Sequence, residues 1–141
     1  MRVFVDRCLA LPDFPGRDLI VVERSPLFQT AFLDANLAMG NLEAVDHAHF
    51  MALYRDAIRR WAGVLHVYLR CDPDLCAQRI RQRGRGSEAE ISPEYLRALH
   101  ERHEAIVLSD HPSRVLVLDC RPEDTPERIA RAIASTILAA S

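Results

Sequence analysis

The sequence predicts an α/β fold in which a parallel sheet of three strands is flanked by helices. Three short apolar runs, rich in valine, leucine and isoleucine, each pass directly into polar residues and a helical pattern. Such runs are typical of parallel strands that are buried on both faces. Four of the helices begin with serine, threonine or aspartate followed by proline, residues that suit the cap and the first position of a helix. The resulting order, β-α-α-β-α-α-β-α, is that of an α/β domain.

The first half of the chain is predicted to hold one strand and two long helices. A weakly amphipathic pattern over Met1–Leu11 leads through a loop to the apolar run Leu19–Val22, which is the first strand. The polar residues Glu23–Ser25 end it, and apolar residues at helical spacing predict helices over Pro26–Met39 and Leu42–Trp61. An acid, a guanidinium and a hydroxyl therefore lie where a buried strand meets a helix N-terminus. In open α/β sheets ligands bind at that edge, and the helix end favours anions.

The second half repeats the alternation of strand and helix. Val64–Cys71 is an apolar strand, and the helix Asp74–Arg83 follows it after an aspartate and a proline. Two glycines and a polar loop separate this helix from the next one, Glu94–Leu108. The third strand is Arg114–Asp119, and a last helix begins at Pro126. Because every strand is followed by at least one helix, the three strands are expected to run parallel.

Length and composition restrict the classes of function. With 141 residues, of which 49% are hydrophobic, residues 1–141 are predicted to form a single domain with a substantial core. The net charge of −2 argues against binding to nucleic acid or to a membrane surface. No apolar run approaches the roughly 20 residues that cross a bilayer, and the first residues lack the apolar core of a signal peptide. We therefore expect a cytoplasmic protein with a small-molecule partner.

The basic residues and cysteines exclude two further kinds of site. All 18 basic residues are arginine, so these residues contain no Walker A loop, which requires a lysine. The four cysteines form no CxxC pair, and reduced thiols that pack in the core are expected rather than disulfides. The histidines His100 and His103 do not form HExxH, and His103 shares a helix face with apolar residues. It is predicted to be a packed histidine and not a metal ligand.

Two segments carry candidate chemistry, and each has two interpretations. In RIRQRGR, Arg79 and Arg83 share a helix face while Arg81 points about 200° away at about 100° per residue. If the helix opens at the following glycine, Arg79, Arg83 and Arg85 can surround a polyphosphate; the alternative is a solvated basic face. The triplet ERS at Glu23–Ser25 is either an anion-binding site or an ion pair beside a helix cap.

Together with their surroundings, these segments strongly resemble the deoxynucleoside kinase family, which phosphorylates the 5′-hydroxyl of deoxynucleosides with ATP. The resemblance runs from about Leu19 to Glu104. It rests on ERS after a strand, on RxxxRxR, on a glutamate three residues beyond the last of these arginines, and on YLxxLHxxHE. It implies a partial P-loop kinase fold, ATP and Mg²⁺ as cofactors, and a deoxynucleoside substrate. It also implies pairing into a homodimer through the helices over residues 25–39 and 42–61.

The resemblance assigns a role to each matching residue. Glu23 corresponds to the acid that helps to hold Mg²⁺ through water, and Arg24 to the arginine beside the 5′-hydroxyl and the transferred phosphate. Glu88 corresponds to the acid that binds the sugar 3′-hydroxyl. The lid arginines Arg79, Arg83 and Arg85 correspond to residues that bind the ATP phosphates. The implied contacts with the base come from Gln29, Phe32 and Leu33. The family often has an aromatic residue at the position of Leu33, and the neighbouring Phe32 compensates for its absence. The loop over residues 121–124 resembles the loop beside adenine.

The chain also departs from the family pattern. Family members begin with a strand, the phosphate loop and a helix, followed by the carboxylate that takes the proton from the 5′-hydroxyl, and the sequence has no counterpart of these. We expect that this chain alone does not phosphorylate deoxynucleosides. Either a neighbouring polypeptide supplies the missing half, or the sheet closes over the gap, or the chain is a truncated reading frame or gene remnant. The alternative function is a non-catalytic module that binds nucleotide or pairs with a kinase subunit.

Overall fold

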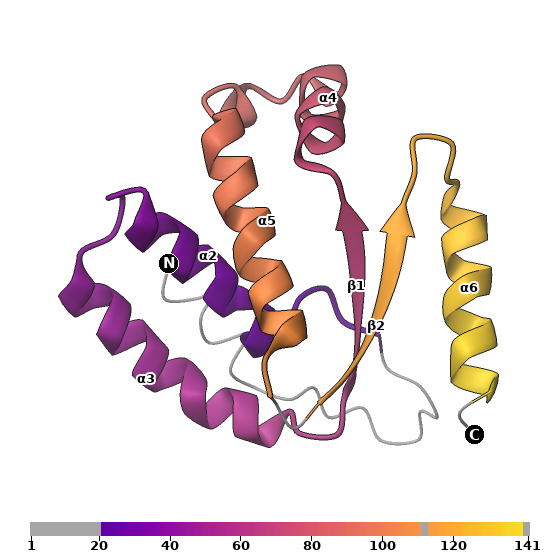
Figure 1. The fold of residues 1–141 in the computed structure, drawn as a ribbon, viewed down its shortest axis with the longest axis horizontal. Coiled ribbons are helices and arrows are strands. Elements are labelled where there is room, and N and C mark those ends of the chain that lie inside the picture. The colour runs from indigo at the N-terminus through magenta and orange to yellow at the C-terminus, as the bar shows by residue number, and fades with distance from the viewer. Residues whose placement is uncertain (1–20, 111–112, 140–141) are drawn as a thin grey trace.

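The computed structural model describes residues 21–110 and 113–139 of the chain. The elements in this part of the chain alternate as in an α/β domain (Figure 1). In chain order they are α2 (Pro26–Ala38), α3 (Ala44–Arg60), β1 (Leu65–Cys71), α4 (Pro73–Arg83), the short 3₁₀ helix η1 (Gly86–Glu88), α5 (Pro93–Leu108), β2 (Arg114–Cys120) and α6 (Pro126–Ala139). The predicted fold class, α/β with a parallel sheet, is confirmed.

The sheet consists of β1 and β2, which run parallel and pair in register from Leu65 with Arg114 to Cys71 with Cys120. The two later strands of the sequence prediction are therefore confirmed. The predicted first strand is not formed at Val21 and Val22, which are 84% and 39% exposed. Its other residues, and the weakly amphipathic segment over residues 1–11, lie outside the described residues. An apolar run becomes a strand only where a neighbouring edge pairs its N–H and C=O groups, and neither described strand pairs with these two residues.

Helices α2, α4, α5 and α6 begin within one residue of the predicted starts because side chains cap their first free amides. Helix α3, predicted from Leu42, begins at Ala44 without a side-chain cap. Ser25 Oγ accepts a hydrogen bond from Phe28 N at 3.5 Å, and Asp72 and Ser92 cap α4 and α5 in the same way. Proline occupies the first position of α2, α4 and α5, where its missing N–H costs nothing. Thr125 Oγ1 accepts from Arg128 N at 3.3 Å at the start of α6.

The best-packed part of the described structure is the contact of α2 with α3 and α5. Leu27 and Ala31 of α2 form a buried cluster with Ile106 of α5. Trp61, just after α3, is also buried, and its carbonyl accepts a hydrogen bond from Ser113 Oγ at 3.3 Å, immediately before β2. In Figure 1 these three helices lie on one side of the strands and α6 lies on the other. Within residues 21–110 and 113–139, no helix has the length and apolar character needed to cross a membrane.

Candidate functional site

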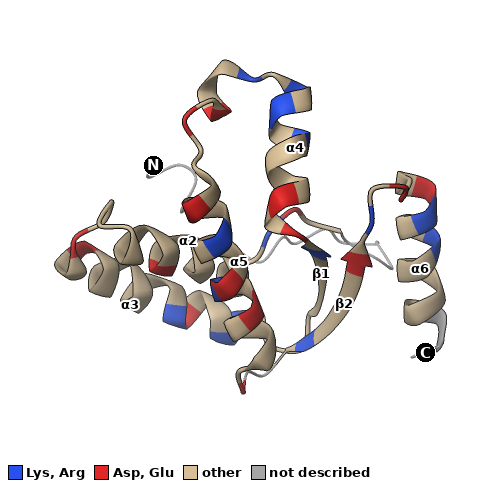
Figure 2. Ribbon diagram, turned by 45° about the horizontal axis from the view of Figure 1, so that its top comes forward, with Lys and Arg blue, Asp and Glu red and all other residues tan. Residues whose placement is uncertain are grey.

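The candidate site lies at the carboxyl edge of the sheet. Both strands point toward this edge, α4 and α6 begin there, and the connection from α4 to α5 projects beyond it (Figure 1). We call residues 79–90, which form this projection, the lid. In Figure 2 basic residues gather at the C-terminal end of α4 and in the connection to α5. The lid arginines are thus concentrated at the edge where parallel sheets bind ligands.

Two of the three predicted phosphate-binding arginines contact one acid of the lid. The Nε and Nη2 atoms of Arg83 donate to Glu88 Oε2 at 2.9 and 2.5 Å. Arg85 Nη1 lies 3.6 Å from Glu88 Oε1. These contacts are possible because α4 ends at Gly84, whose φ of 64° in the left-handed region turns the chain back. The structure therefore brings together Arg83, Arg85 and Glu88.

The third lid arginine, Arg79, faces a different part of the edge. Its Nη2 atom donates to the carbonyl oxygen of Arg121 at 3.1 Å, and its Nη1 atom donates to Cys71 Sγ at 3.5 Å. Arg79 thereby ties the lid helix to the loop after β2, the loop predicted to lie beside adenine. Arg81, which the sequence places outside the phosphate set, is exposed and has no ion pair among the described residues.

A second group of predicted residues surrounds the N-terminus of α2. Arg24 has a φ of 66°, which is uncommon for a residue with a side chain. Its guanidinium lies over the ring of Phe32, with the carbon 5.1 Å from the ring centroid. Its Nε atom is 3.9 Å from Oε1 of Glu23, whose side chain is 91% exposed. Both ERS charges therefore remain accessible to a ligand, while Ser25 is buried as the helix cap.

An aromatic stack supports this end of α2. The rings of Phe28, Tyr68 and His103 stack with centroids 5.6–5.8 Å apart, and Phe32 meets His103 edge-on at 5.7 Å. Burial lowers the pKa of His103, and its Nδ1 atom lies 2.8 Å from the carbonyl oxygen of Leu99. The neutral ring therefore donates from Nδ1. His103 is thus packed among aromatic rings, as predicted.

The predicted base-contacting residues lie along α2. Gln29 is only 6% exposed, and its Nε2 atom has no hydrogen-bond partner among the described residues. A buried amide without a partner is costly, so it marks a position where a ligand can supply the missing acceptor. Leu33 is half-buried one turn further along the helix. Gln29, Phe32 and Leu33 thus share helix α2, and Arg24 lies just before the residue that caps this helix.

The two groups of predicted residues do not touch each other. No hydrogen bond, ion pair or ring contact between described residues joins Arg24 to the lid arginines. Helix α5 separates them, because it begins beside the lid at Pro93 and reaches His103, next to Phe32, only ten residues later. Ten residues of an α-helix span about 15 Å, so Pro93 and His103 lie about 15 Å apart along α5. The predicted residues therefore form two separate groups, Arg24 with its neighbours on α2 and the arginines of the lid.

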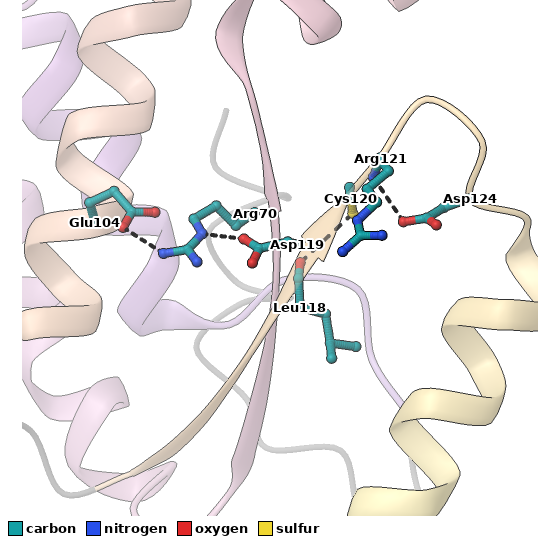
Figure 3. A network of polar contacts seen from close by, with 7 residues as sticks. All are labelled: Arg70, Glu104, Leu118, Asp119, Cys120, Arg121 and Asp124. Carbon is teal, nitrogen blue, oxygen red and sulfur yellow. Dashed lines mark hydrogen bonds and ion pairs between the residues drawn. The ribbon is translucent and has the colours of Figure 1, made fainter.

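A polar network at the same edge was not predicted from the sequence (Figure 3). Arg70 Nε donates to Asp119 Oδ1 at 2.5 Å across the two strands, and Arg70 Nη1 is 3.5 Å from Glu104 Oε2 of α5. The Arg70 guanidinium lowers the pKa of Asp119, while burial and a hydrogen bond with Glu104 raise the pKa of Tyr68. The signal for the strand pair was available, since each strand ends with one charged residue followed by cysteine.

Three thiols lie beside this network. Cys71 and Cys120 are partners in the sheet register, and Cys71, Cys76 and Cys120 are free. Burial, followed by a hydrogen bond with Cys76, raises the pKa of Cys71 to about 11, and burial also raises the pKa of Cys120. The three thiols are half-buried, which agrees with the predicted packing role. Cys8 lies outside the described residues.

A cavity of about 230 Å³ lies between β2 and α6. It is lined by apolar residues of β2 and α6 and by four charged residues, Asp119, Arg121, Asp124 and Arg128. Asp124 accepts from Arg121 N at 2.8 Å and also pairs with Arg128. Arg121 and Asp124 belong to the loop predicted to lie beside adenine, whereas none of the catalytic, base-contacting or lid residues predicted from the sequence lines this cavity.

Comparisons with known proteins agree on one family. The family model described as deoxynucleoside kinase matches residues 2–138. The thymidine kinase of Ictalurid herpesvirus 1 (strain Auburn) is 38% identical over 88 residues, which are 60% of this chain and 38% of that protein. Deoxycytidine kinase of Mus musculus is 48% identical over 42 residues, 30% of this chain and 16% of that one. The deoxyadenosine kinase of M. mycoides, solved with bound dCTP, has a TM-score of 0.67 at 23% identity and covers 82% of this chain and 62% of its own.

Proposed function

The chain belongs to the deoxynucleoside kinase family, and we propose that it carries the deoxynucleoside site and the phosphate-binding lid of an enzyme that transfers the γ-phosphate of ATP to a 5′-hydroxyl. It spans 38% of the length of the herpesvirus thymidine kinase. The proposal therefore concerns an activity in which this chain supplies only part of the site. The named substrates of the relatives share a deoxyribose and differ in their bases, so we propose the deoxynucleoside class without choosing a base.

The observation that carries the proposal is the imbalance of charge in the lid. Arg79, Arg83 and Arg85 project at the carboxyl edge of the sheet, and Glu88 is the one acid among the described residues that pairs with any of them. Guanidinium groups bind phosphate through two parallel hydrogen bonds. Phosphoryl transfer depends mainly on such positioning and on positive charge that offsets the charge developing on the transferred group.

At the other end of the site, we assign Arg24 to the 5′-hydroxyl and the transferred phosphate. Its guanidinium is held over Phe32 yet remains exposed, so it can donate to an oxyanion without prior rearrangement. Gln29 would contact the base, since its buried Nε2 atom lacks an acceptor among the described residues. Leu33 extends the apolar surface of α2 toward the base.

Among the predicted residues, Glu23 is the acid placed to contact Mg²⁺. Mg²⁺ keeps several water molecules and binds through one or two carboxylates together with substrate phosphates. Glu23 offers one exposed carboxylate beside Arg24, which suits a contact through water. When bound, the ion would offset charge on the ATP phosphates.

We further propose a cytoplasmic location, where the free thiols stay reduced. We also propose that two copies pair through α2 and α3, where Val45 is 71% exposed.

Calorimetric titration of the purified chain with ATP tests the lid assignment. We expect Arg83→Gln to weaken binding about tenfold or more, because it removes a charged donor pair. The matched control is Arg81→Gln, which removes the same charge from an exposed side of the same helix and should change the affinity less than about twofold. Equal losses in the two variants would contradict the proposal and indicate only a general basic surface.

A further inference from the structure

The lid contains its own competitor for phosphate. Glu88 contacts both Arg83 and Arg85, and its side chain is 20% exposed while theirs are 46% and 63% exposed. The carboxylate therefore lies beneath two more exposed guanidinium groups. Arg83 uses Nε and Nη2 for this contact, and these two atoms form the edge of a guanidinium that also matches phosphate oxygens.

We propose that Glu88 is an internal counter-ion that occupies the phosphate-binding groups of Arg83 and Arg85 until a polyphosphate displaces it. The inference rests on the proposed function of the lid. A phosphate that binds Arg83 through Nε and Nη2 needs the same donors that Glu88 Oε2 now accepts. The carboxylate and the ligand consequently cannot both occupy that edge of the guanidinium.

Displacement has a consequence for the second substrate. A carboxylate released from Arg83 becomes a free acceptor close to the carboxyl edge, and Glu88 is the residue predicted to accept a hydrogen bond from the sugar 3′-hydroxyl. Binding of the phosphate donor then favours binding of the sugar, and linkage requires the converse effect to be equal. Because the ion pair is partly exposed, the coupling is expected to be two- to fivefold, as for other ion pairs near the surface.

The test uses inorganic tripolyphosphate, a triphosphate without sugar or base, titrated into the full 141-residue chain at about 0.15 M salt. We expect Glu88→Gln to tighten binding two- to fivefold, since the ligand no longer has to displace a carboxylate. The matched control is Glu90→Gln, which removes the same charge two residues away from an exposed acid without an ion pair among the described residues. Its affinity should stay within about 1.5-fold of the unaltered chain.

A double-mutant cycle with Arg83→Gln separates competition from general charge. The gain from Glu88→Gln should disappear in the Arg83→Gln background, and far-UV circular dichroism checks that helix content is kept. The inference is overturned if Glu88→Gln binds tripolyphosphate no better than Glu90→Gln, if the gain persists without Arg83, or if the variant loses helix content and affinity together. If neither the unaltered chain nor Glu88→Gln binds tripolyphosphate, the proposed function of the lid fails as well.

Discussion

Arg24 adopts the left-handed backbone conformation and lies over an aromatic ring, a combination that restricts where its guanidinium can point. The conformation costs about 1 kcal/mol or more for a residue with a side chain. The cation–π contact with Phe32 returns about 0.5–1 kcal/mol at an exposed site. Phe32 therefore holds the Arg24 guanidinium in position, in addition to its predicted contact with the base.

His103 is expected to make the stability of the chain depend on pH. Burial lowers its pKa below the ordinary value of 6.5, so the unfolded chain binds a proton that the folded chain does not. The free energy of unfolding should therefore fall as the pH drops below about 6.5, by up to about 1.4 kcal/mol per pH unit, and this contribution is fully present above that pH.

Urea denaturation between pH 7.5 and 5.5 measures this effect. His103→Phe keeps a ring in the stack with Phe28 and Tyr68 but removes the titrating group, so its unfolding free energy should depend less steeply on pH. The groups that act on His103 electrostatically, His100, Arg24 and Glu104, are unchanged in the variant. Superimposable pH profiles of the two proteins would contradict this account.

At the scale of elements, the helix starts could be predicted because the determining residues are local. A cap and a proline specify the first turn within three residues, and Ser25, Asp72 and Ser92 all act as the pattern indicates. Arg70 of β1 contacts Asp119 of β2, 49 positions away, and Glu104 of α5, 34 positions away. The matching ends of the two strands indicate the first contact, but no local pattern indicates the second. The register of the sheet places Arg70 beside Asp119, and the position of α5 places Glu104 beside Arg70.

The end of α4 gives a prediction for the lid as an element. Gly84 has a φ of 64° and its amide donates to the carbonyl oxygen of Ile80 at 3.1 Å. Gly84→Ala should destabilise the last turn of α4 by about 1 kcal/mol, because a side chain disfavours this conformation. Hydrogen exchange of the amides of α4 should become faster.

Gly86→Ala is the matched control for this substitution. An added Cβ meets no atom within 4 Å at either glycine, but positive φ is found only at Gly84 of the two. The exchange of α4 amides in Gly86→Ala should therefore match that of the unaltered chain. Equal acceleration in both variants would show that replacing either lid glycine speeds exchange, whether or not its φ is positive, and would contradict this account.

At the scale of the whole molecule, the described sheet is incompletely covered. Parallel strands normally lie between two layers, yet in β1 and β2 His66 is the one residue that is buried. The sequence predicted the fold class correctly because the apolar runs and the helix signals agree. It could not show which strands pair, since the same apolar pattern in Val21 and Val22 leads to exposed residues outside the sheet.

We expect the purified 141-residue chain to transfer no phosphate from ATP to thymidine or deoxycytidine. It has no lysine, so it cannot supply the phosphate loop on which ATP hydrolysis and transfer depend in P-loop enzymes. A radiolabel transfer assay under conditions where ATP binding is saturated gives the measurement. Turnover that is lost in Arg24→Ala would contradict the expectation and require another cradle for the phosphates.

The burial of Trp61 has a practical consequence. It is the single tryptophan of the chain, and it lies just before β1, at the end of the molecule opposite the lid (Figure 1). Its fluorescence emission should shift when the packing of α3 fails and remain constant while nucleotide is added at the carboxyl edge. The protein thus carries an intrinsic optical probe that distinguishes loss of structure from occupation of the site, without any added label.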